Sequence, residues 1–232
     1  MTRLAVATWN VHRCVGADRR RDPDRVARAL RELDCDVVGL QEVDCLAHDE
    51  HGFDQLTHLA REAGALHFAA GPAFRRRSVT TGNAVLSRHP LASRRWIDLS
   101  LPGREPRGAL DVTLDVGGSP VRVVCTHLGL RGAERAAQAE RLLAALEGGP
   151  EALTVLLGDF NEWNPRGASL RLLQAAFASP RPAATFPAAW PVLPLDRVFV
   201  RPTGRAVTAA TVATALARAA SDHLPLRAVI SR

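Results

Sequence analysis

Lysine and tyrosine are absent from this sequence of 232 residues, so all 30 side chains counted as lysine or arginine are arginines. Such a composition reflects codon bias as well as surface chemistry, and the net charge of +6 is by itself weak evidence for nucleic-acid binding. A summed positive potential still raises the rate at which an anionic substrate is encountered. The charge therefore favours an anionic partner without identifying it.

Cysteine is scarce, and its spacing excludes two classes of site. The four cysteines, Cys14, Cys35, Cys45 and Cys125, contain no CxxC pair, which argues against a zinc ribbon or a disulfide framework. We expect reduced, structural thiols, as in a cytoplasmic protein.

No hydrophobic run approaches the roughly 18 residues needed to cross a bilayer, which excludes a membrane-spanning protein. The apolar stretch in residues 1–10 runs directly into polar residues without a small-residue cleavage site, so we interpret it as a first strand. The length and the 47% hydrophobic content suit one domain over residues 1–232, which buries about 70–75% of the surface of the unfolded chain. No feature of the sequence indicates the oligomeric state.

Apolar runs of strand length alternate with helical patterns along the chain. Strands are predicted at residues 4–9, 37–40, 84–86, 110–116, 121–125, 153–157, 195–200 and 224–230. Helices are predicted at residues 24–33 and 133–146, the first after an Asp-Pro start signal and the second before a Gly-Gly stop. Residues 117–120, Gly-Gly-Ser-Pro, predict a hairpin turn between two of the strands. Together these patterns predict a mixed α/β protein with more than one sheet.

Two segments are predicted to be irregular. Residues 179–194 are rich in proline and alanine and are expected to form a surface loop. Residues 75–77 are three consecutive arginines in a segment flanked by glycine and proline, which predicts a mobile loop over a site.

Polar residues that are costly to bury stand at or just beyond the ends of the predicted strands, where α/β sheets place their ligands. The sites are Asn10 after the first strand, Glu42 after the second, His127, Asp159 with Asn161, and Asp222 with His223 before the last. Asp196 falls inside an apolar run, so it needs a cation or a histidine as partner.

These residue types predict a hard divalent cation. Oxygen ligands from Asn10, Glu42 and Asp222 suit Mg²⁺ or Mn²⁺ and do not describe a closed zinc site. Asp159 is placed to orient water as a base, and His127 with His223 to contact phosphate or transfer protons. The other six histidines are interpreted as surface or packing residues, of which His12 is expected to border the site. The alternative roles are a turn-forming amide for Asn10, a capping or salt-bridged carboxylate for Glu42, an Asx turn for Asp159 with Asn161, and a buried core histidine for His127.

The ordered series TWN, LQE, GNAVLSR, THL, GDFN, LDRVFV and SDHLPL resembles the endonuclease/exonuclease/phosphatase superfamily, and the resemblance covers nearly the whole chain. It implies a four-layer α/β/β/α sandwich of two mixed sheets, like that of deoxyribonuclease I, with a cleft along one sheet edge. It further implies metal binding by Glu42 with Asn10 and Asp222 nearby. The resemblance also implies that His127, Asp159, Asn161 and His223 bind phosphate or position water, and that Asp196 orients a histidine.

Departures from the family pattern indicate which branches of the superfamily the chain resembles less. The abasic-site branch uses a tyrosine, which this chain lacks, and an acidic residue at the position that His12 occupies. Thr126-His127 is instead similar to the deoxyribonuclease I, sphingomyelinase and phosphatase branches, and the small bacterial subgroup that the chain resembles suggests a lipid phosphodiester. Further substrate contacts are predicted at His12, Asn83 and Arg107, the last because a guanidinium matches phosphate oxygens.

The resulting prediction is a Mg²⁺- or Mn²⁺-dependent hydrolase that attacks a phosphodiester or phosphomonoester with activated water. A nuclease is the first alternative, although only 5% of residues are aromatic and available for stacking on bases. A non-catalytic anion-binding module on the same fold is the second alternative.

Overall fold

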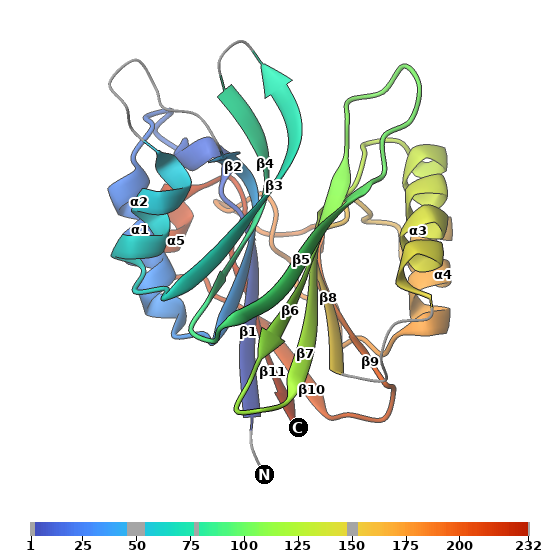
Figure 1. Ribbon diagram of the computed structural model, residues 1–232. Coiled ribbons are helices and arrows are strands. Elements are labelled where there is room, and N and C mark those ends of the chain that lie inside the picture. Colours follow the sequence, from blue (N-terminus) through green and yellow to red (C-terminus); the bar gives the residue numbers. More distant parts are fainter. Residues whose placement is uncertain (1–2, 46–53, 77–78, 148–152, 232) are drawn as a thin grey trace.

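The computed structural model describes residues 3–45, 54–76, 79–147 and 153–231. It contains two mixed sheets with helices on both outer faces (Figure 1). The first sheet has the strand order β10-β11-β1-β2-β4-β3 and the second the order β5-β6-β7-β8-β9. The four-layer sandwich implied by the family resemblance is therefore confirmed.

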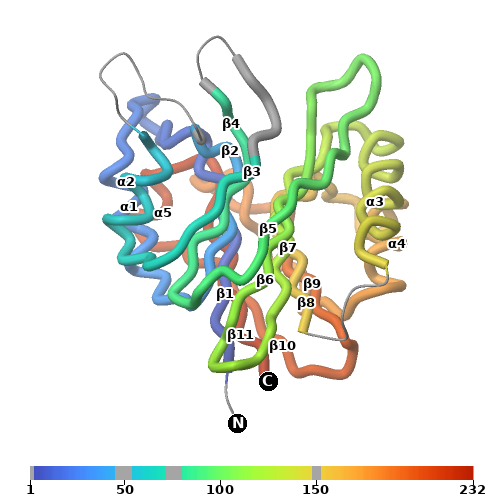
Figure 2. The backbone as a smooth tube through the Cα atoms, viewed as in Figure 1, coloured from blue at the N-terminus to red at the C-terminus, as the bar shows by residue number. Residues whose placement is uncertain are grey.

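The first sheet is built from both ends of the chain. Its strands are β1 (Arg3–Asn10), β2 (Val37–Cys45), β3 (His67–Arg76), β4 (Val79–Ser87), β10 (Val207–Thr211) and β11 (Leu226–Ser231). Strands β1 and β2 are parallel, whereas β1 and β11 are antiparallel. The two termini consequently lie together at the end of the sandwich where β1 begins (Figure 2).

The second sheet has strands β5 (Leu91–Asp98), β6 (Gly108–Asp115), β7 (Pro120–His127), β8 (Leu153–Asp159) and β9 (Asp196–Arg201). The predicted hairpin is β6 and β7, and Gly117 and Gly118 in its turn have φ of 62° and 80°, which glycine adopts without steric cost. Strands β7 and β8 are parallel, and the other neighbours are antiparallel.

Three hydrophobic clusters separate the four layers. The central cluster joins the two sheets through residues such as Val85, Val123 and Val155. The second packs α1 (Pro23–Leu33), α2 (Gln55–Glu62) and α5 (Ala215–Ala220) on the first sheet, and the third packs α3 (Gly132–Leu146) and α4 (Ala168–Ala176) on the second. None of the helices in the described residues is long and apolar enough to cross a membrane.

Two sequence predictions need correction. Arg75 and Arg76 belong to β3 and pair with β4, so they do not form a loop, while Arg77 lies outside the described residues. Residues 179–194 are irregular as predicted, but they are not only a surface loop, because Thr185 is fully buried and Ala188 nearly so.

Candidate active site

The predicted site residues meet at the end of the sandwich where β1, β2, β7 and β8 finish. In the second sheet the Cα positions of His127 on β7 and Asp159 on β8 are direct partners, and Asp159 is the partner of Asp196 on β9. In the first sheet Asn10 ends β1 beside Gln41 on β2. Strand register therefore brings together residues that are far apart in the sequence.

Asp159 lies at the centre of this group and is almost completely buried. Its Oδ2 accepts a hydrogen bond from Asn10 Nδ2 at 3.1 Å and lies 3.5 Å from His127 Nε2 and 3.7 Å from His223 Nε2. Its Oδ1 accepts from the backbone N–H of Asn161 at 2.9 Å. Amide and imidazole groups from three other segments thus surround one carboxylate.

Glu42 reaches the site through an irregularity in β2. The pairing of β2 with β4 shifts register between Leu40 and Val43, and Glu42 has a φ of 56°, a left-handed conformation that non-glycine residues rarely adopt. Its Oε1 accepts from Asn10 Nδ2 at 3.1 Å. Such conformations persist mainly where the surroundings enforce them, which often marks a functional site. The strand predicted to end near Glu42 in fact continues to Cys45.

His127 is buried and neutral. Burial, followed by the positive charge of Arg107, lowers the pKa of His127 to about 3. Arg107 Nη1 lies 3.3 Å from His127 Nδ1, and a guanidinium can only donate, so Nδ1 accepts and the proton resides on Nε2, facing Asp159. Arg107 also pairs with Glu105 at 3.1 Å. The predicted contact of Arg107 with phosphate is untested and stays a prediction.

His223 is the opposite case, a buried imidazolium. Burial by itself would lower the pKa of His223, but the carboxylates of Asp196, Asp159 and Asp222 outweigh it and raise the pKa to about 10. Its Nδ1 donates to Asp196 Oδ2 at 2.9 Å, and the hydroxyl of Thr185 donates to the same oxygen. The expectation from the sequence that Asp196 has a histidine as its partner matches this geometry, and the histidine is His223.

Asp222 and His12 lie at the more open side of the group. The side chain of Asp222 is 45% exposed, and its Oδ1 lies 3.7 Å from His12 Nδ1 and accepts from Ser221 Oγ at 3.3 Å. The same Ser221 hydroxyl lies 2.7 Å from the carbonyl oxygen of Asn10. A serine therefore connects the segment carrying Asp222 to the end of β1.

Two further amides connect parts of the site. Asn161, with a φ of 50°, donates through Nδ2 to the carbonyl of Leu128, just beyond His127. Asn83 on β4 is buried and donates through Nδ2 to the carbonyls of Gly108 and Cys125, which ties the first sheet to the second. Substrate binding by Asn83 stays a prediction.

The profile described as "Endonuclease/Exonuclease/phosphatase family" matches residues 7–223. The chain belongs to this family. Proteins of the family are hydrolases of phosphoester bonds and generally use divalent metals.

Individual relatives extend over almost the whole chain. The Escherichia coli K12 protein YbhP is 35% identical over 247 aligned residues, covering 97% of this chain and 95% of YbhP. The crystal structure of an endonuclease/exonuclease/phosphatase from Beutenbergia cavernae has a TM-score of 0.79 and 27% identity, covering 99% of this chain and 72% of that one. The mannosyl-6-phosphatase of Bacteroides thetaiotaomicron has a TM-score of 0.78 and 17% identity, covering 99% and 100%. At that identity the last comparison shows the fold alone.

The oxygen-rich donor set fits the hard divalent cation generally used in the family. Among the described residues no group of three or more histidine, cysteine, aspartate and glutamate side chains forms a ready metal cage. Mg²⁺ usually takes one or two carboxylates and completes its shell with water and substrate phosphate. Glu42, half-buried with one oxygen bonded to Asn10, offers this kind of open site, and Asp222 is the partly exposed carboxylate nearby.

Sequence analysis missed part of the site. Thr185 and Phe186 come from the irregular segment, where no periodicity marks them, yet Thr185 bonds to Asp196 and the Phe186 ring lies 4.8 Å from that of His223. The buried pair of Arg135 and Glu162 was also missed, although Glu162 directly follows GDFN.

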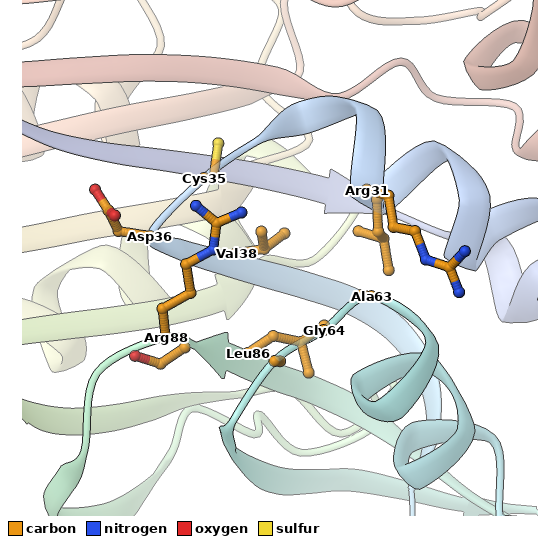
Figure 3. A pocket seen from close by; sticks show the side chains of 11 residues that line it. Arg31, Cys35, Asp36, Val38, Ala63, Gly64, Leu86 and Arg88 are labelled. Carbon is orange, nitrogen blue, oxygen red and sulfur yellow. The ribbon is translucent and has the colours of Figure 1, made fainter.

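A cavity lies at the other end of the first sheet, where β2 begins and β4 ends (Figure 3). Its charged lining residues already have partners: Arg31 pairs with Glu62, Arg88 pairs with Asp34, and Asp36 accepts from the N–H of Ala5. This cavity contains none of the predicted site residues.

Proposed function

We propose that the protein hydrolyses a phosphodiester or phosphomonoester with water, with Mg²⁺ or Mn²⁺ as cofactor. The observation that carries the proposal is the convergence of Asn10, His127 and His223 on the single carboxylate of Asp159. These four side chains come from segments that only the folded sheets bring together.

Glu42 would hold the cation, with Asn10 and Asp222 beside it. A bound divalent cation supplies Lewis-acid polarisation of the phosphoryl oxygens. Support comes from the chemistry of the donors: Glu42 and Asp222 offer carboxylate oxygens, and the Asn10 amide donates through Nδ2 to Glu42 and accepts through Oδ1 from the N–H of His12. Within the described residues, Cys14, Cys35 and Cys125 are unpaired and buried.

In this proposal Asp159 is the base and His223 is the acid. Asp159 accepts hydrogen bonds and takes a proton from the attacking water, whose oxygen forms the new bond to phosphorus as the ester bond breaks. The His223 imidazolium, with Nδ1 held by Asp196, is the acid that supplies a proton to the leaving oxygen. Neutral His127 offers its Nε2–H to a phosphoryl oxygen, since Arg107 occupies its other nitrogen.

The test compares hydrolysis of bis-p-nitrophenyl phosphate, with Mg²⁺ or Mn²⁺, by the wild type, Asp159→Asn and His223→Ala. We expect losses in kcat of about 10² to 10⁴, the usual contribution of acid–base groups. Glu140→Gln, an exposed carboxylate on α3, is the matched control and keeps wild-type activity. Activity that survives both site substitutions, or that is equal in excess chelator, refutes the proposal.

The alternatives are separated by the same experiment. A non-catalytic anion-binding module shows no metal-dependent turnover with any ester, although the presence of the whole set of predicted groups argues against it. A nuclease is distinguished by metal-dependent cleavage of DNA or RNA that exceeds cleavage of sugar phosphates and phospholipids.

A further inference from the structure

Among the described residues, four large apolar side chains are strongly exposed on loops that adjoin the site. They are Leu130, Trp163, Trp190 and Val192, with exposed fractions of 72%, 61%, 78% and 59%. We call them the apolar rim. The two other large apolar side chains that are exposed in the described part of the chain, Leu66 and Phe68, lie where β3 begins, at the opposite end of the first sheet.

Each rim residue belongs to a loop that also supports the site. Leu130 follows Leu128, whose carbonyl accepts from Asn161, and Trp163 is two residues beyond Asn161. Trp190 and Val192 belong to the segment whose Phe186 packs on His223. The rim residues are therefore carried by the loops that hold the catalytic groups.

The backbone of these loops is held in place. Arg135 Nη1 donates to the carbonyl of Leu130 at 2.7 Å, and the N–H groups of Trp190 and Val192 donate to Pro187 and Phe186 at 3.0 and 2.9 Å. Exposed apolar groups gathered around a functional site usually mark an interaction surface.

Positive charge accompanies the rim. Arg131 follows Leu130, Arg166 is three residues beyond Trp163, Arg13 lies beyond the end of β1, and Arg104 is in the loop that carries Arg107. All four are exposed, and none forms an ion pair with a carboxylate of the described residues. The loops around the site thus carry exposed apolar side chains together with exposed guanidinium groups that form no ion pair with a described carboxylate.

We propose that the apolar rim docks the protein on the surface of an anionic phospholipid bilayer. Tryptophan prefers the boundary between headgroups and acyl chains, and each arginine near an anionic surface adds to the attraction. Leu130 and Val192 favour a lipid over a nucleic acid as the partner. Burial of an aliphatic side chain among acyl chains stabilises binding, whereas such a side chain offers no ring for base stacking. Docking turns the site towards headgroup phosphates, so a phospholipid headgroup ester becomes the substrate class; that consequence rests on the proposed function.

The experiment measures binding of the full chain to vesicles of equimolar phosphatidylcholine and phosphatidylglycerol, by co-sedimentation and by quenching of tryptophan fluorescence with brominated acyl chains. Of the four tryptophans, Trp9 is completely buried, whereas Trp163 and Trp190 are exposed reporters. We expect binding to anionic vesicles, quenching of these tryptophans, and weaker binding at high salt or with phosphatidylcholine alone.

Two leucines provide a matched pair of variants. Leu130→Ser lowers the partition coefficient several-fold, and Trp163→Ala with Trp190→Ala lowers it at least about tenfold, as expected when two interfacial anchors are lost. Leu66→Ser removes an equally exposed leucine, at 75%, from the opposite end and leaves binding unchanged.

Asp159→Asn separates this proposal from the proposed function, because a catalytically inactive protein still binds vesicles if the rim is the anchor. Absence of wild-type binding at low salt, or equal binding by the rim variants and wild type, overturns the proposal. Rim-dependent binding of single-stranded DNA without vesicle binding also overturns it and assigns the surface to nucleic acid instead.

Discussion

Replacing Glu162 by alanine removes the centre of a buried polar network behind the site. Glu162 Oε2 accepts from Arg135 Nε and Nη2 at 3.1 and 2.9 Å and from Ser169 Oγ at 3.2 Å, while Oε1 accepts from the N–H of Asn164. The side chains of Arg135 and Glu162 are only 7% and 4% exposed. The substitution therefore leaves a guanidinium in the interior without its counter-charge.

Breaking a buried ion pair by removing one partner costs about 3–5 kcal/mol. For a chain of this length each kcal/mol lowers the Tm by about 2–4 °C, so we expect Glu162→Ala to lower it by roughly 6–20 °C. Arg135 also holds the carbonyl of Leu130, in the loop after His127, so phosphoester hydrolysis falls together with stability.

The assay is urea denaturation and thermal unfolding of wild type, Glu162→Ala and the exposed control Glu140→Ala on the same side of the sandwich. A double variant, Arg135→Met with Glu162→Leu, removes both charges and is expected to lose less stability than Glu162→Ala alone. If Glu162→Ala lowers the free energy of unfolding by less than about 1 kcal/mol, a loss close to that of ordinary surface substitutions, the reasoning is refuted.

Two further predictions concern ionisation. Burial acts to raise the pKa of Asp111, but hydrogen bonds from Arg122 and Arg95 outweigh it and hold the pKa below its usual value. The unfolded chain therefore binds more protons, so this contribution to stability is present above about pH 4 and is lost as pH falls through the lower folded pKa. Asp111→Asn should lower the free energy of unfolding measured with urea at pH 7, and its difference from wild type should be smaller at pH 3. A difference that is the same at both pH values contradicts the assignment. In metal-free protein, Asp196→Asn removes a carboxylate that favours the His223 imidazolium, so nuclear magnetic resonance titration should show a lower pKa for His223 than in wild type, and an equal pKa excludes Asp196 as its orienting partner.

Much of the site was predictable because polar residues that end apolar strands are conspicuous in sequence. Asn10, His127 and Asp159 each end a strand in which most of the preceding residues are buried. The order of the motifs resembles that of the endonuclease/exonuclease/phosphatase superfamily, and this resemblance predicted the four-layer sandwich. Periodicity alone predicted only a mixed α/β chain.

Two of the strands that were not predicted from the sequence lack that contrast. Strand β5 lies at a sheet edge and most of its residues are exposed, so no apolar run or clean alternation marks it. Strand β10 is also an edge strand and alternates between half-buried and exposed residues. Thr185 and Phe186 reach His223 through tertiary packing of an irregular segment, and the bulge that turns Glu42 into the site depends on pairing between β2 and β4. Such contacts are set by distant neighbours and leave no local signal.

The central claim is that separate strands converge on one place able to hold a hard cation and the oxygens of a phosphate ester. A crystal of the protein soaked in Mn²⁺ tests it most directly through an anomalous difference map. We expect a peak about 2.1 Å from a carboxylate oxygen of Glu42, close to Asn10 and within reach of the group around Asp159. A peak elsewhere, with none at Glu42 under conditions that support hydrolysis, would contradict it.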